Sequence, residues 1–128
     1  MNSSDYPRTS MHGSTLDLLA AVTGAGPSAP TVTSTSTIPA IDNYASSASR
    51  TSEGLYVITL REKFPRILHV APVITRASGV LKHVNVVSWS ETAGTITVQV
   101  SLADGSGVDD LETSDLLRLW ISARKETY

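Results

Sequence analysis

The sequence predicts an all-β fold, an antiparallel sandwich or barrel that follows an extended N-terminal arm. Residues 1–50 are dominated by Ser, Thr, Ala, Pro and Gly, whereas apolar and polar residues alternate from about Arg50 onward. Short alternating segments separated by turn residues are typical of antiparallel sandwiches and barrels. We therefore expect an arm over residues 1–43 and a β-sandwich domain over residues 44–128.

The arm contains one short apolar run, which begins at Leu16 and ends at Val22. Ser14 or Thr15 can cap a helix there and Gly24 can end it, so the pattern favours a short helix over residues 14–23. A helix of this length is not stable alone in water, and its apolar side chains need a surface to cover them. The alternative is a transient helix in a disordered tail.

Residues 24–41 contain three prolines within a Ser/Thr tract, which disfavours helix and favours an extended chain. The stretch has too little apolar surface to fold by itself. Val32, Ile38 and Ile41 nevertheless supply spaced apolar side chains. This pattern favours a strap that lies across a neighbouring protein, and the alternative is a flexible low-complexity linker.

The first half of the domain predicts strands over residues 44–52, 55–60 and 67–75. Glu53 and Gly54 form the turn between the first two, and Tyr56, Ile58 and Leu60 share one face of the second. Pro72 lies inside the third strand. Because proline cannot donate a hydrogen bond to a neighbouring strand, it marks an edge, a bulge or a break.

The second half predicts strands over residues 81–89, 95–102 and 116–124. Gly94 can adopt the positive φ that the hairpin turn at 91–94 requires. A polar loop is expected over residues 104–114. The inward positions of the last two strands are Ile96, Val98, Val100 and Leu102, and Leu117, Leu119, Ile121 and Ala123.

The composition of the chain argues against several classes of function. Lys and Arg number 10 against 12 Asp and Glu, and this balance argues against nucleic-acid binding, which needs a concentrated basic face. No apolar run approaches the roughly 20 residues that span a bilayer, so no membrane is expected. The absence of cysteine removes disulfides and thiolate metal sites. A small domain without these supports is marginal alone, which favours association with other subunits.

No residue pattern predicts catalysis, a cofactor or a metal site, and we expect no enzyme. His12, His69 and His83 show no metal-binding spacing, and no G-x-S-x-G motif occurs. The acidic segment 104–115 is the one carboxylate cluster. It is interpreted as a solvated loop, and calcium binding is the alternative.

The two tryptophans favour an interface. Trp120 lies opposite the inward residues of its strand, and Trp89 ends a strand between two serines. Aromatic and Arg side chains dominate binding energy at protein interfaces, although a Trp can also cover the edge of a core. The interface candidates are Val32, Ile38, Ile41, Trp89, Arg118, Trp120 and Arg124.

Four segments resemble small virion proteins of tailed bacteriophages. In such proteins a G-x-Y-x-(V/I)-T-L strand precedes an F-P-x-(L/I)-L turn, as do residues 54–60 and 64–68 here. A later (A/S)-G-T-(I/V)-x-V strand is similar to residues 93–98, and a closing Leu-Trp-Ile-Ser-Ala-Arg strand is similar to residues 119–124. The resemblance covers about residues 50–124.

The resemblance implies a capsid decoration, or cement, protein with a jelly-roll-like β domain on the capsid exterior. It implies self-association, for which we expect a trimer, with a dimer as second choice, and contact with the major capsid protein. Such a protein is made in the host cytoplasm. A tail, collar or fibre-attachment component is the alternative, and a carbohydrate- or calcium-binding module is the alternative of another class. We also expect deletion of residues 1–40 to leave a folded domain.

Overall fold

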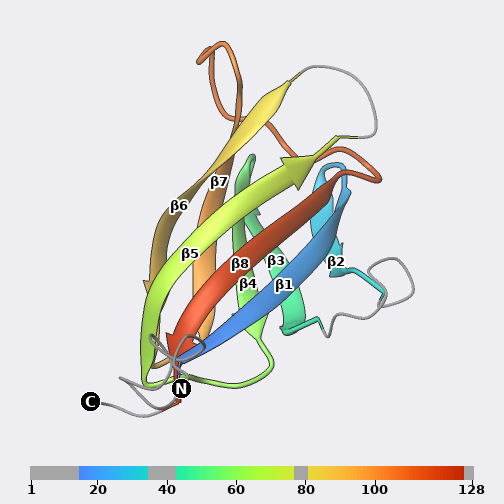
Figure 1. The fold of residues 1–128 in the computed structure, drawn as a ribbon. Helices are drawn as coiled ribbons and strands as arrows, with labels where there is room; N and C mark the ends of the chain where they lie inside the picture. The colour runs from blue at the N-terminus through green and yellow to red at the C-terminus, as the bar shows by residue number, and fades with distance from the viewer. Residues whose placement is uncertain (1–14, 35–42, 77–80, 126–128) are drawn as a thin grey trace, which may run out of the picture.

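The computed structural model describes residues 15–34, 43–76 and 81–125, which form a sandwich of two four-stranded antiparallel sheets (Figure 1). Sheet A contains β1 (Thr15–Ala25), β2 (Ser28–Val32), β5 (Arg66–Thr75) and β8 (Leu116–Arg124). Sheet B contains β3 (Ala45–Ser52), β4 (Leu55–Leu60), β6 (Lys82–Ser90) and β7 (Thr95–Leu102). The strand orders are β2-β1-β8-β5 and β3-β4-β7-β6, so the all-β sandwich is confirmed.

The strands expected between residues 44 and 124 are confirmed to within one residue at each end. The turn glycines Gly54 and Gly94 have φ of 73° and 71°, a conformation that other residues rarely adopt. A side chain at Gly54 would also approach the Val100 carbonyl oxygen to 2.7 Å. Pro72 lies on β5, an edge strand of sheet A, which is where a sheet tolerates proline.

The core lies between the sheets and follows the predicted alternation. Leu102 is only partly buried, because it ends its strand. The inward side chains on β4, β7 and β8 are buried: Tyr56, Ile58, Leu60, Ile96, Val98, Val100, Leu117, Leu119, Ile121 and Ala123.

The expected helix over residues 14–23 is wrong, because residues 15–25 form β1. This strand pairs with β8 over nine successive positions, from Thr15 opposite Arg124 to Thr23 opposite Leu116. Its even positions from Leu18 to Val22 enter the core, while its odd positions face away from it. The long-range pairing satisfies the backbone and buries side chains, which outweighs a local helix preference that is marginal at this length.

The expected division at residues 43 and 44 is also wrong for the described part of the arm. β1 and β2 form a hairpin around Gly26, whose φ is 66°, and both strands belong to sheet A. Residues 28–32 are extended, as the prolines predicted, but they pair with β1 of the same chain. Val32 lies exposed on the edge strand β2, whereas Ile38 and Ile41 lie outside the described residues.

Asn43 joins this hairpin to sheet B. Its side-chain oxygen accepts hydrogen bonds from the backbone N–H groups of Ala21 and Ala45, each at 2.9 Å. Its amide nitrogen donates to the carbonyl oxygens of Ala21 and Thr33, at 2.8 and 3.0 Å. The buried Asn43 side chain therefore forms hydrogen bonds with the β1 backbone at the point where β2 has ended.

Candidate functional site

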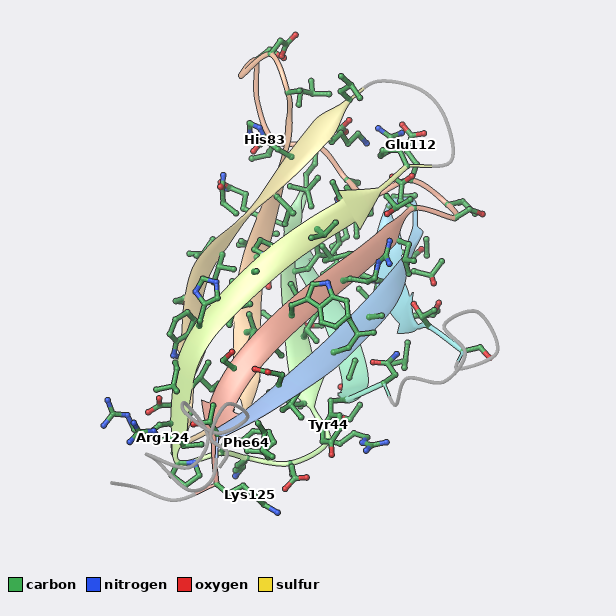
Figure 2. The ribbon with its side chains drawn as sticks, in the orientation of Figure 1. Tyr44, Phe64, His83, Glu112, Arg124 and Lys125 are labelled. Atoms are coloured by element: carbon green, nitrogen blue, oxygen red, sulfur yellow. The ribbon has the colours of Figure 1, made fainter. Side chains whose placement is uncertain are left out.

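The acidic segment is held against the sandwich by three cations. Asp109, Asp110, Glu112 and Asp115 all form ion pairs, whereas residues 104–107 are exposed as the solvated-loop interpretation predicted. Figure 2 places Glu112 at the opposite end of the molecule from Arg124. The segment thus stabilises one end of the fold.

Asp110 connects this segment to β3 and β4. Two hydrogen bonds of 2.9 Å join its carboxylate to Arg50, and it also accepts from the Gly54 N–H and the Tyr56 hydroxyl. These donors, chiefly Arg50, hold the pKa of Asp110 below its usual value. Burial raises the pKa of the Tyr56 hydroxyl, whose oxygen accepts a hydrogen bond from the Leu111 N–H at 2.8 Å.

Lys82 and Arg76 engage the remaining carboxylates. The fully buried Lys82 Nζ lies 3.1 Å from Asp109 Oδ2 and 3.5 Å from Glu112 Oε2. Arg76 Nε lies 2.9 Å from Oδ1 of the buried Asp115, and its Nη2 lies 3.2 Å from Glu112 Oε1. Buried charges need such partners, because leaving one unpaired costs several kcal/mol.

The low pKa of Asp110 predicts acid sensitivity. Because the folded-state pKa is below the unfolded one, this carboxylate stabilises the fold above about pH 4 and loses that effect as the pH falls further. We expect Asp110→Asn to lower Tm at pH 7 and the deficit to shrink below about pH 4. Thermal unfolding at successive pH values measures this, with the exposed Glu62→Gln as control. A deficit that stays constant with pH would contradict the prediction.

The ion pairs engage the carboxylates that a calcium ion would need in this segment. Calcium needs several oxygens that converge on one point, but these carboxylates are already paired with Arg50, Arg76 and Lys82. Within residues 15–34, 43–76 and 81–125, no group of three or more His, Cys, Asp or Glu side chains is placed to hold a metal ion. His69 and His83 lie on different sheets, and His12 is outside the described residues.

The outer face of sheet A carries an exposed tryptophan. Trp120 on β8 pairs with Leu19 of β1 and Ala71 of β5, so the three side chains form one row across the sheet. Trp120 is 42% exposed, and Val73 in the next row is 43% exposed. Leu19 is buried in a small second cluster on this side.

A polar row lies beside the Trp120 row. Asp17, Ser122 and His69 are cross-strand partners in β1, β8 and β5, and the Ser122 hydroxyl donates to Asp17 Oδ1 at 2.9 Å. These residues, with Trp120 and Ala71, line an open pocket of about 330 Å³. Leu18 and Ile121 complete its lining.

The polar row contains the residue types of a serine hydrolase in an arrangement that does not suit that chemistry. A nucleophilic serine is activated by an imidazole, which a carboxylate orients from its other side. Here the serine is the middle residue of the row, and its hydroxyl donates directly to Asp17. The row is therefore suited to hydrogen bonding a ligand and not to nucleophilic attack.

The outer face of sheet B has a different character. Its outward positions carry no Asp, Glu, Lys or Arg, and they present hydroxyl, amide and apolar side chains together with the imidazole of His83 on β6. Each row runs across the whole sheet, because the cross-strand partners share a face. Two rows illustrate the pattern: Ser47, Thr59, Thr95 and Ser90, followed by Ser49, Val57, Thr97 and Ser88.

The structure brings together three of the interface candidates predicted from the sequence. Arg118, Trp120 and Arg124 lie along the outer face of β8, flanking the polar row. Val32 lies on the edge strand β2, which β1 separates from β8. Trp89 is 38% exposed and pairs with the buried Ile96, which places it on the core side of β6 and agrees with the core-edge alternative.

Sequence reasoning misses the polar row. It assigns Asp17 to a helix, and Ser122 is one serine among many. The one available signal is the position of Ser122 two residues from Trp120, which places both on the same face of a strand. The pairing of Ser122 with Asp17, 105 residues away, has no local signal.

Comparison with protein-family models, with curated proteins and with solved structures gives no match. Among the described residues there is no helix long and apolar enough to cross a membrane.

Proposed function

We propose that the chain is a structural virion protein that decorates the exterior of a tailed-phage capsid and bridges neighbouring major capsid proteins. The motifs at residues 54–60, 64–68, 93–98 and 119–124 support this proposal, because they resemble those of small phage virion proteins. Self-association as a trimer, with a dimer as second choice, and jelly-roll connectivity are parts of the same proposal.

The observation that carries the proposal is the outer face of sheet B, whose outward positions carry no Asp, Glu, Lys or Arg. Soluble domains usually mix charges of both signs over their surface, and the centres of protein interfaces are depleted of charge. The partly exposed Val57, Thr97 and Gln99 lie on the two central strands of this face. Such a surface can make the same weak contacts at many capsid positions, and many weak contacts then add to strong attachment.

In this proposal a smaller part of residues 1–43 acts as a strap on neighbouring subunits than the sequence analysis expected. β1 and β2 belong to the sandwich, so only the remaining residues of the arm are available as a strap. Ile38 and Ile41 remain candidates for contact with a neighbouring subunit. Val32 is available to such a contact from the edge strand β2.

A single charge in the centre of sheet B tests the attachment surface. Thr97→Glu changes an outward side chain on β7, so we expect a stability loss of at most about 1 kcal/mol but a loss of particle occupancy. Occupancy is measured by adding purified protein to particles that lack it and counting bound copies by electron microscopy. Trp120→Ala on the opposite face is the matched control and is expected to leave occupancy unchanged.

Three outcomes would reject parts of the proposal. Full occupancy by Thr97→Glu would exclude sheet B as the attachment surface. Loss of occupancy in Trp120→Ala alone would move attachment to sheet A, the face that the sequence analysis gave as an interface candidate. Copies confined to one vertex would replace capsid decoration with a tail, collar or fibre-attachment role.

A further inference from the structure

We propose that the pocket beside Trp120 binds a neutral sugar ring, so that the exposed face of the protein recognises a glycan. The proposal concerns sheet A and does not rest on attachment of sheet B to a capsid. The site consists of the aromatic side chain of Trp120 and the polar row Asp17, Ser122 and His69.

The pocket has a volume and an aromatic lining residue that suit a sugar ring. Trp120 is large, partly exposed and held on the central strand β8, so its ring offers a fixed apolar surface. Ala71 occupies the neighbouring position on β5 and leaves room beside the indole. A pocket of about 330 Å³ is at the lower end of the range for small-molecule sites.

The polar row supplies both acceptors and donors at the edge of that wall. The Ser122 hydroxyl occupies one acceptor site of Asp17, so the carboxylate keeps further acceptor sites for ligand hydroxyls. The His69 imidazole adds two ring nitrogens that can take part in hydrogen bonds, and Ser122 Oγ can accept while it donates to Asp17. Because a sugar hydroxyl both donates and accepts, it suits this mixed set.

Charge around the pocket selects a neutral ligand. Arg118, Arg124 and Arg66 share this face of the sheet, in the rows on either side of the polar row and Trp120. They oppose the approach of a Lys or Arg side chain that would otherwise suit a tryptophan beside a carboxylate. Asp17, inside the pocket, opposes an anion in the same place. A neutral polyhydroxyl ring avoids both repulsions.

Binding can be read directly from the tryptophan itself. The chain has two tryptophans, so Trp89→Phe leaves Trp120 as the sole indole fluorophore. We titrate this variant separately with the methyl glycosides of glucose, galactose, mannose and N-acetylglucosamine. At least one is expected to give a saturable fluorescence change with a Kd of about 1 mM, typical of a small, weakly held ligand.

Amide NMR spectra of the unsubstituted chain give a second readout that does not depend on Trp89. The same glycoside is expected to shift the signals of Asp17, His69 and Ser122 and to leave those of Val57 and Thr97 unchanged. We expect Asp17→Ala to weaken binding about tenfold, the effect of one lost charge-assisted hydrogen bond. Trp120→Ala is expected to abolish binding, whereas Thr97→Glu, on the opposite sheet, is the matched control that retains it.

The absence of saturable binding by all four glycosides at about ten times the expected Kd would overturn the proposal. It would also be overturned by self-association that Trp120→Ala abolishes and that the glycosides do not inhibit, because a second copy would then occupy this face. If Thr97→Glu fails to attach to capsids but still binds the sugar, the result supports sheet B as the attachment surface and leaves the pocket proposal intact. If Trp120→Ala loses sugar binding but keeps normal capsid occupancy, the result supports the pocket proposal independently of the proposed function.

Discussion

A chain that begins at residue 35 is expected not to fold. The deletion removes β1 and β2, and it leaves the central strand β8 without one of its two partners. It also removes Leu18, Ala20 and Val22 from the core. Burial of a single Leu or Val contributes about 1.5–3 kcal/mol, and a domain has only about 5–15 kcal/mol of net stability. This expectation reverses the one from sequence, in which the arm was dispensable for folding.

Far-UV circular dichroism and thermal unfolding of the shortened chain measure this effect. We expect no cooperative transition, since the exposed edge and core of the remaining strands lack their partner. The matched control is the full chain cut once between residues 34 and 43, with both fragments left together. That sample retains every strand and is expected to unfold cooperatively. A cooperative transition in the shortened chain would show that residues 45–124 fold alone.

Asn43→Ala is expected to be strongly destabilising, because this side chain joins the β1–β2 hairpin to sheet B. The substitution leaves the buried N–H groups of Ala21 and Ala45 without their acceptor, and it removes the donor to Thr33. An unsatisfied buried polar group costs about 1–3 kcal/mol, so two of them cost about 2–6 kcal/mol in the absence of water. The lower half of this range is expected if a water molecule enters the site.

Urea unfolding measures the loss as a lower midpoint at an unchanged slope. Asn85→Ala is the matched control, because Asn85 is exposed on β6 and surface substitutions usually change stability by less than about 0.5 kcal/mol. Asn43→Asp is expected to be destabilising as well. It keeps an acceptor but places a second oxygen against the carbonyls of Ala21 and Thr33. Equal stability of the Asn43→Ala and Asn85→Ala variants would contradict this account of the junction.

Local sequence was sufficient for the strands after residue 44. There the alternation of side chains and the glycine turns agree with each other, and both act within a few residues. β1 was missed because its pattern, with apolar side chains at successive positions from Leu18 to Val22, is that of a strand buried on both faces. Such a run cannot be distinguished from a short helix by periodicity alone.

The candidate site was predictable only in part, for a related reason. The outward position of Trp120 follows from the alternation of β8, so the sequence placed this side chain on the outer face, where the structure has it. The pocket requires Asp17 and His69 as neighbours, and these come from strands far apart in the sequence. The same holds for Asp110, whose partner Arg50 is 60 residues away. Composition therefore suggested a solvated acidic loop where the fold contains ion pairs.

The pairing of β1 with β8 affects how the chain reaches its native state during synthesis. The first described strand cannot pair with β8 until Arg124 has left the ribosome, so β1 must wait until all the other described strands have been made. Folds dominated by such non-local pairings have high contact order and fold in about milliseconds to seconds. During that interval the apolar residues of β1 are exposed and can contact other chains. We therefore expect chaperones to bind the nascent chain.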